Sequence, residues 1–275
     1  MIENFSTMAI EYQGKVKGMF FDYQKAGQGP TIAFRHGAGD DSSIFLKLRE
    51  RVHKEKGSTL LVDSRGHGYS DYGSVIRDDA ENFAAVLREC GIQKTHLVGY
   101  SMGATQALNF AHQAPEKVEK MLLLAPVFFD IKYLKAQPIA LLPFYHAAKC
   151  LYAAPEGERE FKDTDFTEGS TNVHRAFLER VRATGLKPML AALEELEEVG
   201  FPDYLSALDH DTMIMAGKKD PLATHRSSEK LRESMAPNAR LQWLDTGHVI
   251  INEDREGQGS IEAMLKSFLC AHPIR

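Results

Sequence analysis

The feature that most constrains the fold of this chain is an alternation of short apolar runs with amphipathic helical segments. The runs are bounded by glycine, proline or charged residues, as is typical of buried strands. Strands that alternate with helices predict a mostly parallel sheet with helices on both faces. We expect a hairpin of two strands within residues 8–23 and further strands at 31–34, 58–62, just before Ser101, and at 118–126, 212–216 and 240–244.

The helical segments carry their apolar residues on one face. In residues 78–90, Phe83, Val86, Leu87 and Cys90 recur at helical spacing. Serine residues at the start of the first and the last helix are expected to cap them. We expect helices at 43–56, 78–90, directly after Ser101, at 225–235 and at 260–270, the last capped by Ser260.

Residues 127–202 interrupt this alternation and contain no convincing buried strand. Their helical pieces are expected at 138–153, 172–184 and 188–199, the last begun by Pro188. We interpret residues 127–202 as a helical lid, and residues 1–126 and 203–275 as one core. The alternative is that these helices only pack on the sheet.

The composition of the chain excludes several classes of function. A net charge of −5 over 275 residues gives no basic surface for nucleic acid or an anionic membrane. The N-terminus lacks a basic start followed by an apolar run, and the apolar stretch 121–129 is too short to cross a bilayer. Three widely spaced cysteines have no close ligand partners for a metal. We therefore expect a cytoplasmic protein with reduced thiols and no metal; the oligomeric state is not predicted.

The segment GYSMG, residues 99–103, places Ser101 between two glycines at a predicted strand-to-helix junction. A serine on such a tight turn has a strained backbone, and large neighbours would collide with the helix and the adjoining strand. Its hydroxyl is then exposed at the carboxyl end of the sheet, where open α/β sheets place ligands. The pentapeptide also occurs by chance, so the assignment of Ser101 as a nucleophile needs support from elsewhere in the chain.

Support for Ser101 as a nucleophile comes from three further segments. Asp220 follows the strand expected at 212–216, and His248 follows the strand expected at 240–244. The order serine, aspartate, histidine is that of the triad in G-x-S-x-G hydrolases. The loop HGAG, residues 36–39, follows an early strand and is placed to offer backbone N–H groups to an oxyanion.

Together these segments resemble the α/β-hydrolase superfamily, and within it the capped esterase, lactonase and carbon–carbon hydrolase group. The resemblance covers nearly the whole chain outside the lid. It rests on RHGAG (35–39), DSRGHGYS (63–70), GYSMG, AGKKDPL (216–222) and TGHVI (246–250). It implies an α/β fold with a mostly parallel, eight-stranded type of sheet and an inserted helical lid.

The resemblance also implies a role for each site residue. Ser101 would attack the substrate carbonyl, His248 would take the serine proton, and Asp220 would orient the imidazole. The backbone N–H groups of Ala38 and Met102 would hold the oxyanion. Some relatives carry the acid after the preceding strand, which makes Asp130 the alternative to Asp220.

One position departs from the family pattern. The residue before the HGAG loop is normally aliphatic, and here it is Arg35. A guanidinium at the end of a central strand must find a partner. One interpretation is a carboxylate anchor for an acidic substrate; the other, which we favour, is a pairing with Asp40, Asp41 or Asp63 that fixes the loop.

The lid is rich in apolar residues near its start, which suggests a mostly hydrophobic pocket or a core of the lid itself. Phe128, Phe129 and His146 are candidates for substrate binding. We expect a cofactor-free hydrolase that cleaves an ester or lactone of a small to medium organic substrate. The alternatives are a carbon–carbon bond hydrolase of a vinylogous diketone, for which Arg35 would gain interest, and a non-hydrolytic or binding protein on the same fold.

Overall fold

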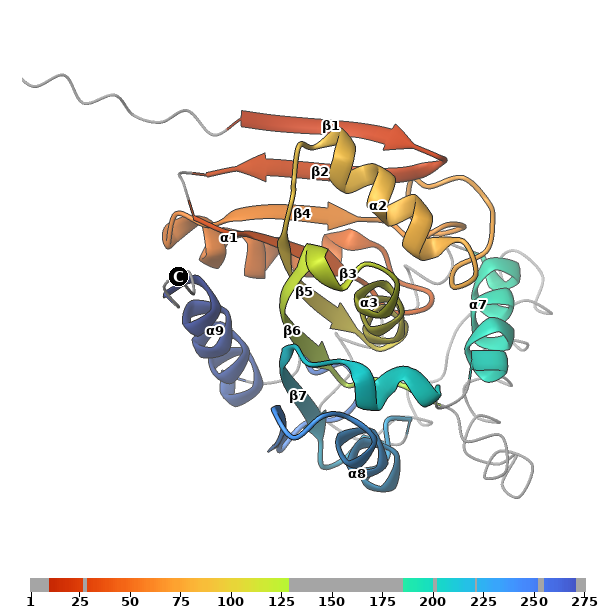
Figure 1. Cartoon of the computed structure of the whole chain (residues 1–275), viewed down its shortest axis with the longest axis vertical. Helices are drawn as coiled ribbons and strands as arrows, with labels where there is room; N and C mark the ends of the chain where they lie inside the picture. Colours follow the sequence, from red (N-terminus) through yellow and green to blue (C-terminus); the bar gives the residue numbers. More distant parts are fainter. Residues whose placement is uncertain are drawn as a thin grey trace, which may run out of the picture.

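The computed structural model describes residues 10–26, 29–128, 185–199, 202–220, 222–251 and 255–270. Eight strands form one sheet in the order β1-β2-β4-β3-β5-β6-β7-β8 (Figure 1). Neighbours from β4 to β8 run parallel, whereas β2 is antiparallel to both β1 and β4. The strands are β1 (Ile10–Val16), β2 (Met19–Lys25), β3 (Thr31–Arg35), β4 (Ser58–Val62), β5 (Thr95–Tyr100), β6 (Val118–Leu124), β7 (Asp211–Gly217) and β8 (Ala239–Leu244).

Helices cover both faces of the sheet, as the alternation of elements predicts (Figure 1). None of the helices in the described ranges has the length and apolar character needed to cross a membrane. The α-helices are α1 (Leu46–Lys54), α2 (Asp79–Glu89), α3 (Met102–Gln113), α7 (Leu186–Val199), α8 (His225–Ser234) and α9 (Arg255–Cys270), and the short 3₁₀ helices are η1 (Ser42–Phe45), η2 (Pro115–Lys117) and η4 (Asp203–Ala207).

Two predicted helix caps are wrong. Asp41, not a serine, caps η1, because its carboxylate accepts a hydrogen bond from the backbone N–H of Ser43 at 2.8 Å. Ser260 lies inside α9, which begins at Arg255. The glycines that precede Ser260 disfavour a helix, but burial of Ile261 and Leu265 against the sheet outweighs this local preference.

The predicted lid helix at 188–199 is observed as α7, with Pro188 tolerated in its first turn. Glu195 connects α7 to the loop before α2. One of its carboxylate oxygens accepts hydrogen bonds from Ser74 Oγ (2.8 Å), Val75 N (3.2 Å) and Ile76 N (2.8 Å). Helix α7 is therefore fixed to the loop before α2. The helices expected at 138–153 and 172–184 lie outside the described residues.

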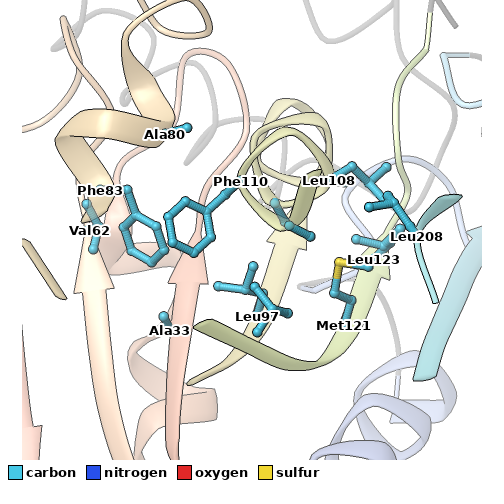
Figure 2. Close-up of a cluster of buried hydrophobic side chains, with 14 of the residues drawn as sticks. Ala33, Val62, Ala80, Phe83, Leu97, Leu108, Phe110, Met121, Leu123 and Leu208 are labelled. Atoms are coloured by element: carbon cyan, nitrogen blue, oxygen red, sulfur yellow. The ribbon is translucent and has the colours of Figure 1, made fainter. Parts of the chain in front are cut away.

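The core is divided by the sheet into two apolar clusters. Successive residues of a buried strand point to opposite faces, so Ala33 packs toward α2 and α3 whereas Phe34 packs toward α1. Figure 2 shows the cluster under α2 and α3, where the rings of Phe83 and Phe110 meet edge to face with centroids 4.7 Å apart. The central strands are covered on both faces, which explains why they appear in the sequence as nearly unbroken apolar runs.

Helix α3 lies so close to the central strands that only glycine fits at two positions. A Cβ atom on Gly99 would overlap the carbonyl oxygen of Gly103. A Cβ atom on Gly103 would overlap the carbonyl oxygen of Arg35, at the end of β3. The two glycines on either side of Ser101 are therefore required by the contact between α3 and the sheet.

We predict that Gly103→Ala lowers the free energy of unfolding by about 3 kcal/mol or more, because neither backbone can move away without disturbing the sheet. Urea unfolding followed by circular dichroism measures this change. The control is Gly259→Ala in α9, where a Cβ atom would meet nothing within 4 Å. It should raise stability by about 0.5–1 kcal/mol. Equal effects of the two substitutions would contradict the close contact.

Two buried histidines link the stability of the fold to pH. Burial lowers the pKa of His67, in the loop after β4, and of His96, in β5, to about 4 from the ordinary 6.5. Both rings are neutral in the folded chain at neutral pH. As the pH falls below 6.5, the unfolded chain binds protons before the folded chain does, so stability decreases between pH 6.5 and pH 4.

We predict that His96→Gln reduces this pH dependence. Between pH 7 and pH 4.5 one such histidine removes about 2 kcal/mol of stability, and the variant should lose that much less than the wild type. The measurement is urea unfolding at the two pH values. The control is His225→Gln, which removes an exposed histidine of α8. A His96→Gln profile equal to that of the wild type would disprove the assignment.

Candidate active site

Ser101 lies at the turn between β5 and α3, with the left-handed backbone angles φ 53° and ψ −117°. A non-glycine residue adopts this conformation only where its surroundings enforce it. Here the Ser101 N–H donates to the carbonyl of Leu124 (2.9 Å), and the Ser101 carbonyl accepts from Ala104 N (3.0 Å). The strained turn holds the serine hydroxyl at the carboxyl end of the parallel strands.

His248 lies within hydrogen-bond distance of this hydroxyl. Its Nε2 is 3.0 Å from Ser101 Oγ, and its Nδ1 is 2.8 Å from Asp220 Oδ2. An ionised carboxylate only accepts hydrogen bonds, so the Asp220 contact assigns the ring proton to Nδ1. The lone pair on Nε2 then faces the serine hydroxyl and is able to accept its proton.

Asp220 is held by the backbone on its other side. Its Oδ1 accepts hydrogen bonds from Leu222 N and Ala223 N, both at 2.8 Å. The Asp220 side chain is fully buried and that of His248 is 14% exposed. Hydrogen bonds to the charged form compensate for burial of the carboxylate. The three predicted residues therefore form one connected chain of hydrogen bonds, although they come from three different strand ends.

The HGAG loop lies directly beside Ser101. Arg35 and Gly99 are partners in the parallel pairing of β3 with β5, so both strands end at the same level. A Cβ atom on Gly37 would be 3.2 Å from the Ser101 Cβ. The predicted donor Ala38 is next along this loop. The other, Met102, is the first residue of α3, where an N–H has no acceptor within the helix.

Tyr100 is not among the predicted site residues, but its ring contributes to this arrangement. It is buried, with a ring atom 3.0 Å from a Cβ built on Gly37 and its centroid 5.5 Å from that of the His248 ring. Tyr100 therefore packs between the loop and the histidine. Its position inside GYSMG was the available signal, since the residue before a strained serine must be close to the same site.

Arg35 has a different partner from those predicted. Its Nη2 is 2.5 Å from Asp79 Oδ1, on α2, and donates to Gln106 Oε1, on α3, at 3.1 Å. The expectation of a partner among Asp40, Asp41 and Asp63 was wrong because residues alternate along β3. Arg35 points to the same face as Ala33, toward α2 and α3. At 1% exposure it is also not available to bind substrate, which corrects that candidate role.

Two of the three proposed aspartate partners are engaged elsewhere. Asp41 caps η1. The carboxylate of Asp63 accepts from the backbone N–H groups of Ser42 (2.8 Å) and Tyr69 (2.9 Å) and so fixes the loop that follows β4. Burial raises the pKa of Asp63, and these hydrogen bonds oppose the shift. Asp79 was missed, although its spacing of four from Phe83 places it on the apolar face of α2.

The predicted substrate-binding residues of the lid are only partly described. Phe128 is 5% exposed and belongs to the apolar cluster beneath α3, which assigns it to the core. Phe129 and His146 lie outside the described residues, as does Asp130, the alternative acid. Within the described ranges, no group of three or more histidine, cysteine, aspartate or glutamate side chains is arranged to hold a metal ion.

The chain is similar in sequence to parts of two curated hydrolases. It is 27% identical over 164 residues to the 2-hydroxy-6-oxo-6-phenylhexa-2,4-dienoate hydrolase of Comamonas testosteroni, which covers 56% of each chain. It is 32% identical over 104 residues to the 2-(acetamidomethylene)succinate hydrolase of Mesorhizobium japonicum, or 37% of each chain. The chain thus spans about half, or less, of the length of these relatives.

The fold also matches that of a solved enzyme over nearly its whole length. The enol-lactonase from Burkholderia xenovorans superposes with a TM-score of 0.74 at 17% identity, covering 94% of this chain and 100% of the other. At this identity the likeness establishes the architecture alone. The family model described as alpha/beta hydrolase fold matches residues 30–254. That range contains the serine, aspartate and histidine of the hydrogen-bonded chain, and the protein belongs to the alpha/beta hydrolase fold family.

Proposed function

We propose that the protein is a serine hydrolase that cleaves an ester or lactone of a small to medium organic substrate through an acyl-enzyme at Ser101. The observation that carries this proposal is the continuous contact from Ser101 Oγ to His248 (3.0 Å) and on to Asp220 (2.8 Å). A serine hydroxyl is a weak nucleophile until a neighbouring base takes its proton, and this geometry supplies the base.

In the first step, Ser101 Oγ bonds to the carbonyl carbon while its proton moves to Nε2 of His248. The imidazolium is stabilised by Asp220, whose other carboxylate oxygen is held by two backbone N–H groups. Negative charge develops on the carbonyl oxygen, and the N–H groups of Ala38 and Met102 are assigned to receive it. Each such donor typically contributes about 3 kcal/mol to the transition state.

The intermediate then collapses, and His248 gives its proton to the departing alkoxide, which leaves as an alcohol. In a lactone this alcohol stays attached to the acyl group. Water next attacks the acyl-enzyme, with His248 taking one water proton and returning a proton to Ser101 Oγ. The cycle releases a carboxylic acid and restores the enzyme, so it requires neither a cofactor nor a metal.

A second candidate is hydrolysis of a carbon–carbon bond in a vinylogous diketone. It is favoured by the relative from Comamonas testosteroni, which is named for a 2-hydroxy-6-oxo dienoate. Such a substrate carries a carboxylate that needs a cationic partner. Arg35 was the residue suggested for that task, and its pairing with Asp79 removes this support. We therefore place ester or lactone hydrolysis first.

We predict that a fluorophosphonate probe labels Ser101 and that Ser101→Ala abolishes both labelling and turnover. The loss in kcat should be at least about 10⁴-fold, since the nucleophile is removed. Mass mapping identifies the labelled residue, and turnover is measured on p-nitrophenyl esters, aliphatic lactones and a 2-hydroxy-6-oxo dienoate. The control is Ser43→Ala, at an exposed serine of η1.

Labelling elsewhere, or full turnover by Ser101→Ala, would contradict the hydrolase proposal. Turnover of the dienoate alone would favour the carbon–carbon bond reaction over ester or lactone hydrolysis. Both reactions use the same three residues, so the substrate panel and not the labelling separates them.

We further predict that Asp220→Asn lowers kcat by about 10⁴-fold with little change in stability. An asparagine donates to Nδ1 and so forces the proton onto Nε2, the wrong tautomer for accepting from serine. The measurement is kcat on the best ester, with Asp245→Asn as control. Asp245 is an exposed partner of Lys219, three positions before His248 in the sequence. A variant that keeps more than a tenth of the activity would transfer the role to another acid, with Asp130 the first to test.

A further inference from the structure

Arg35 and Asp79 form a fully buried ion pair that the proposed mechanism does not use. Their side chains are 1% and 0% exposed, and their closest atoms are 2.5 Å apart. The Arg35 guanidinium carbon also lies 4.8 Å from the centroid of the Phe83 ring. The pair joins the end of β3 to α2, and Arg35 directly precedes the HGAG loop that carries Ala38.

Stability alone is a weak explanation for this pair. Removing two charges from water is costly, and apolar replacements of similar volume are often neutral or stabilising. Moreover, Arg35 Nε and Asp79 Oδ2 are buried without a hydrogen-bond partner among the described residues. Burial raises the pKa of Asp79, against the opposing effect of Arg35. A pair of this kind calls for a role beyond packing.

A buried hydrogen-bond circuit leads from Arg35 to the HGAG loop. Gln106 Oε1 accepts from both Arg35 Nη2 and Ser64 Oγ, each at 3.1 Å. The Ser64 backbone N–H donates to His36 Nε2 at 2.9 Å. His36 Nε2 is thus an acceptor, so the ring proton is on Nδ1 and is donated to the Gly37 carbonyl at 2.8 Å. The side chains of the circuit are polar and buried: those of Arg35, Gln106, Ser64 and His36.

The last contact of the circuit restrains the direction of the Ala38 N–H. The Gly37 carbonyl and the Ala38 N–H belong to one peptide group, and no peptide bond among the described residues is cis. In a trans peptide these two groups point in opposite directions. Holding the carbonyl toward His36 therefore turns the Ala38 N–H to the opposite side. Asp40 N also donates to this carbonyl, at 3.2 Å.

We propose that Arg35 and Asp79 are positioning residues, which orient the oxyanion-binding N–H of Ala38 through Gln106, Ser64 and His36. This inference rests on the proposed function. The ion pair holds the Gln106 amide in one orientation, with its Nε2 bound to the Val75 carbonyl at 2.7 Å and its Oε1 directed at Ser64. Without Arg35 that amide loses its charged donor, and the restraint that the circuit places on the loop is weakened.

The test is the double variant Arg35→Met/Asp79→Leu. It removes both charges and keeps apolar volume, so its urea midpoint should equal or exceed that of the wild type. We expect kcat on the best ester to fall by about tenfold to a hundredfold with KM within about twofold, since the donor acts in the transition state. The inhibition constant of a boronic acid, whose tetrahedral adduct needs the same donor, should rise by the same factor as kcat falls.

The matched control is Arg49→Met/Asp22→Leu. This pair is also largely buried, with a closest distance of 2.8 Å, but it joins α1 to β2. Its kcat should be that of the wild type. An equal loss of kcat in both double variants would overturn the proposal in favour of a general packing effect. A rise in KM with unchanged kcat in the Arg35 variant would overturn it as well.

A readout independent of turnover separates this inference from the proposed function. In ¹⁵N-histidine spectra, the Nδ1–H signal of His36 should shift and exchange faster with water in the Arg35/Asp79 variant only. An unchanged signal would overturn the proposal even if activity fell. Failure of the wild type to react with fluorophosphonate would instead contradict the proposed function, and the His36 signal would still report on the circuit.

Ser64→Ala provides a second route if the double variant does not fold. It breaks the circuit between Gln106 and His36 and leaves the ion pair in place. We expect a smaller loss of kcat in the same direction, again at constant KM. The control is Ser228→Ala on α8, where a buried hydroxyl without a partner among the described residues is removed. A Ser64→Ala variant with the kcat of the wild type would contradict the proposal that Arg35 acts on Ala38 through Ser64.

Discussion

The close contact between α3 and strands β3 and β5 is the constraint on which the rest of this structure depends. It requires glycine at positions 99 and 103, on either side of Ser101, and it makes the turn from β5 to α3 very tight. The serine therefore adopts left-handed backbone angles, and its hydroxyl lies above the edge of the sheet. The same contact places the end of β3 against α3. The packing of α3 on the sheet therefore positions both the loop after β3 and Ser101.

The hydrogen bonds around the site determine which ring nitrogen carries the proton in two histidines. Asp220 holds the proton of His248 on Nδ1, and the Ser64 N–H holds that of His36 on Nδ1. In His248 this leaves Nε2 directed at the serine, where a proton can be exchanged. In His36 both nitrogens are occupied inside the protein. Two histidines with the same tautomer thus have different tasks, because only one of them faces the reacting hydroxyl.

Much of the fold and the site was predictable because local patterns and chain order determine them. Buried runs such as 58–62 match their strands, and parallel strands bring Ser101, Asp220 and His248 to one edge. The partner of Arg35 was not predicted, since a side-chain contact depends on which face of β3 it occupies. Counting alternation from Ala33 would have excluded the nearby aspartates. The cap at 43 failed because Asp41, two residues earlier, is the residue whose side chain accepts from the chain at that point. The cap at 260 failed because packing of α9 outweighs the local propensity of its glycines.

The two proposed oxyanion donors are held by different kinds of force. Met102 is the first residue of α3, so its N–H is aimed by the helix itself and by the contact at Gly103. Ala38 lies in a loop, and the carbonyl of its peptide group is held by the His36 side chain and by the N–H of Asp40. Buried polar side chains that hold a loop need hydrogen-bond partners of their own. Gln106 and Ser64, both buried, supply such partners. Arg35, at a position where the family normally has an aliphatic residue, therefore lies close in the chain to Ala38, the donor that no helix holds.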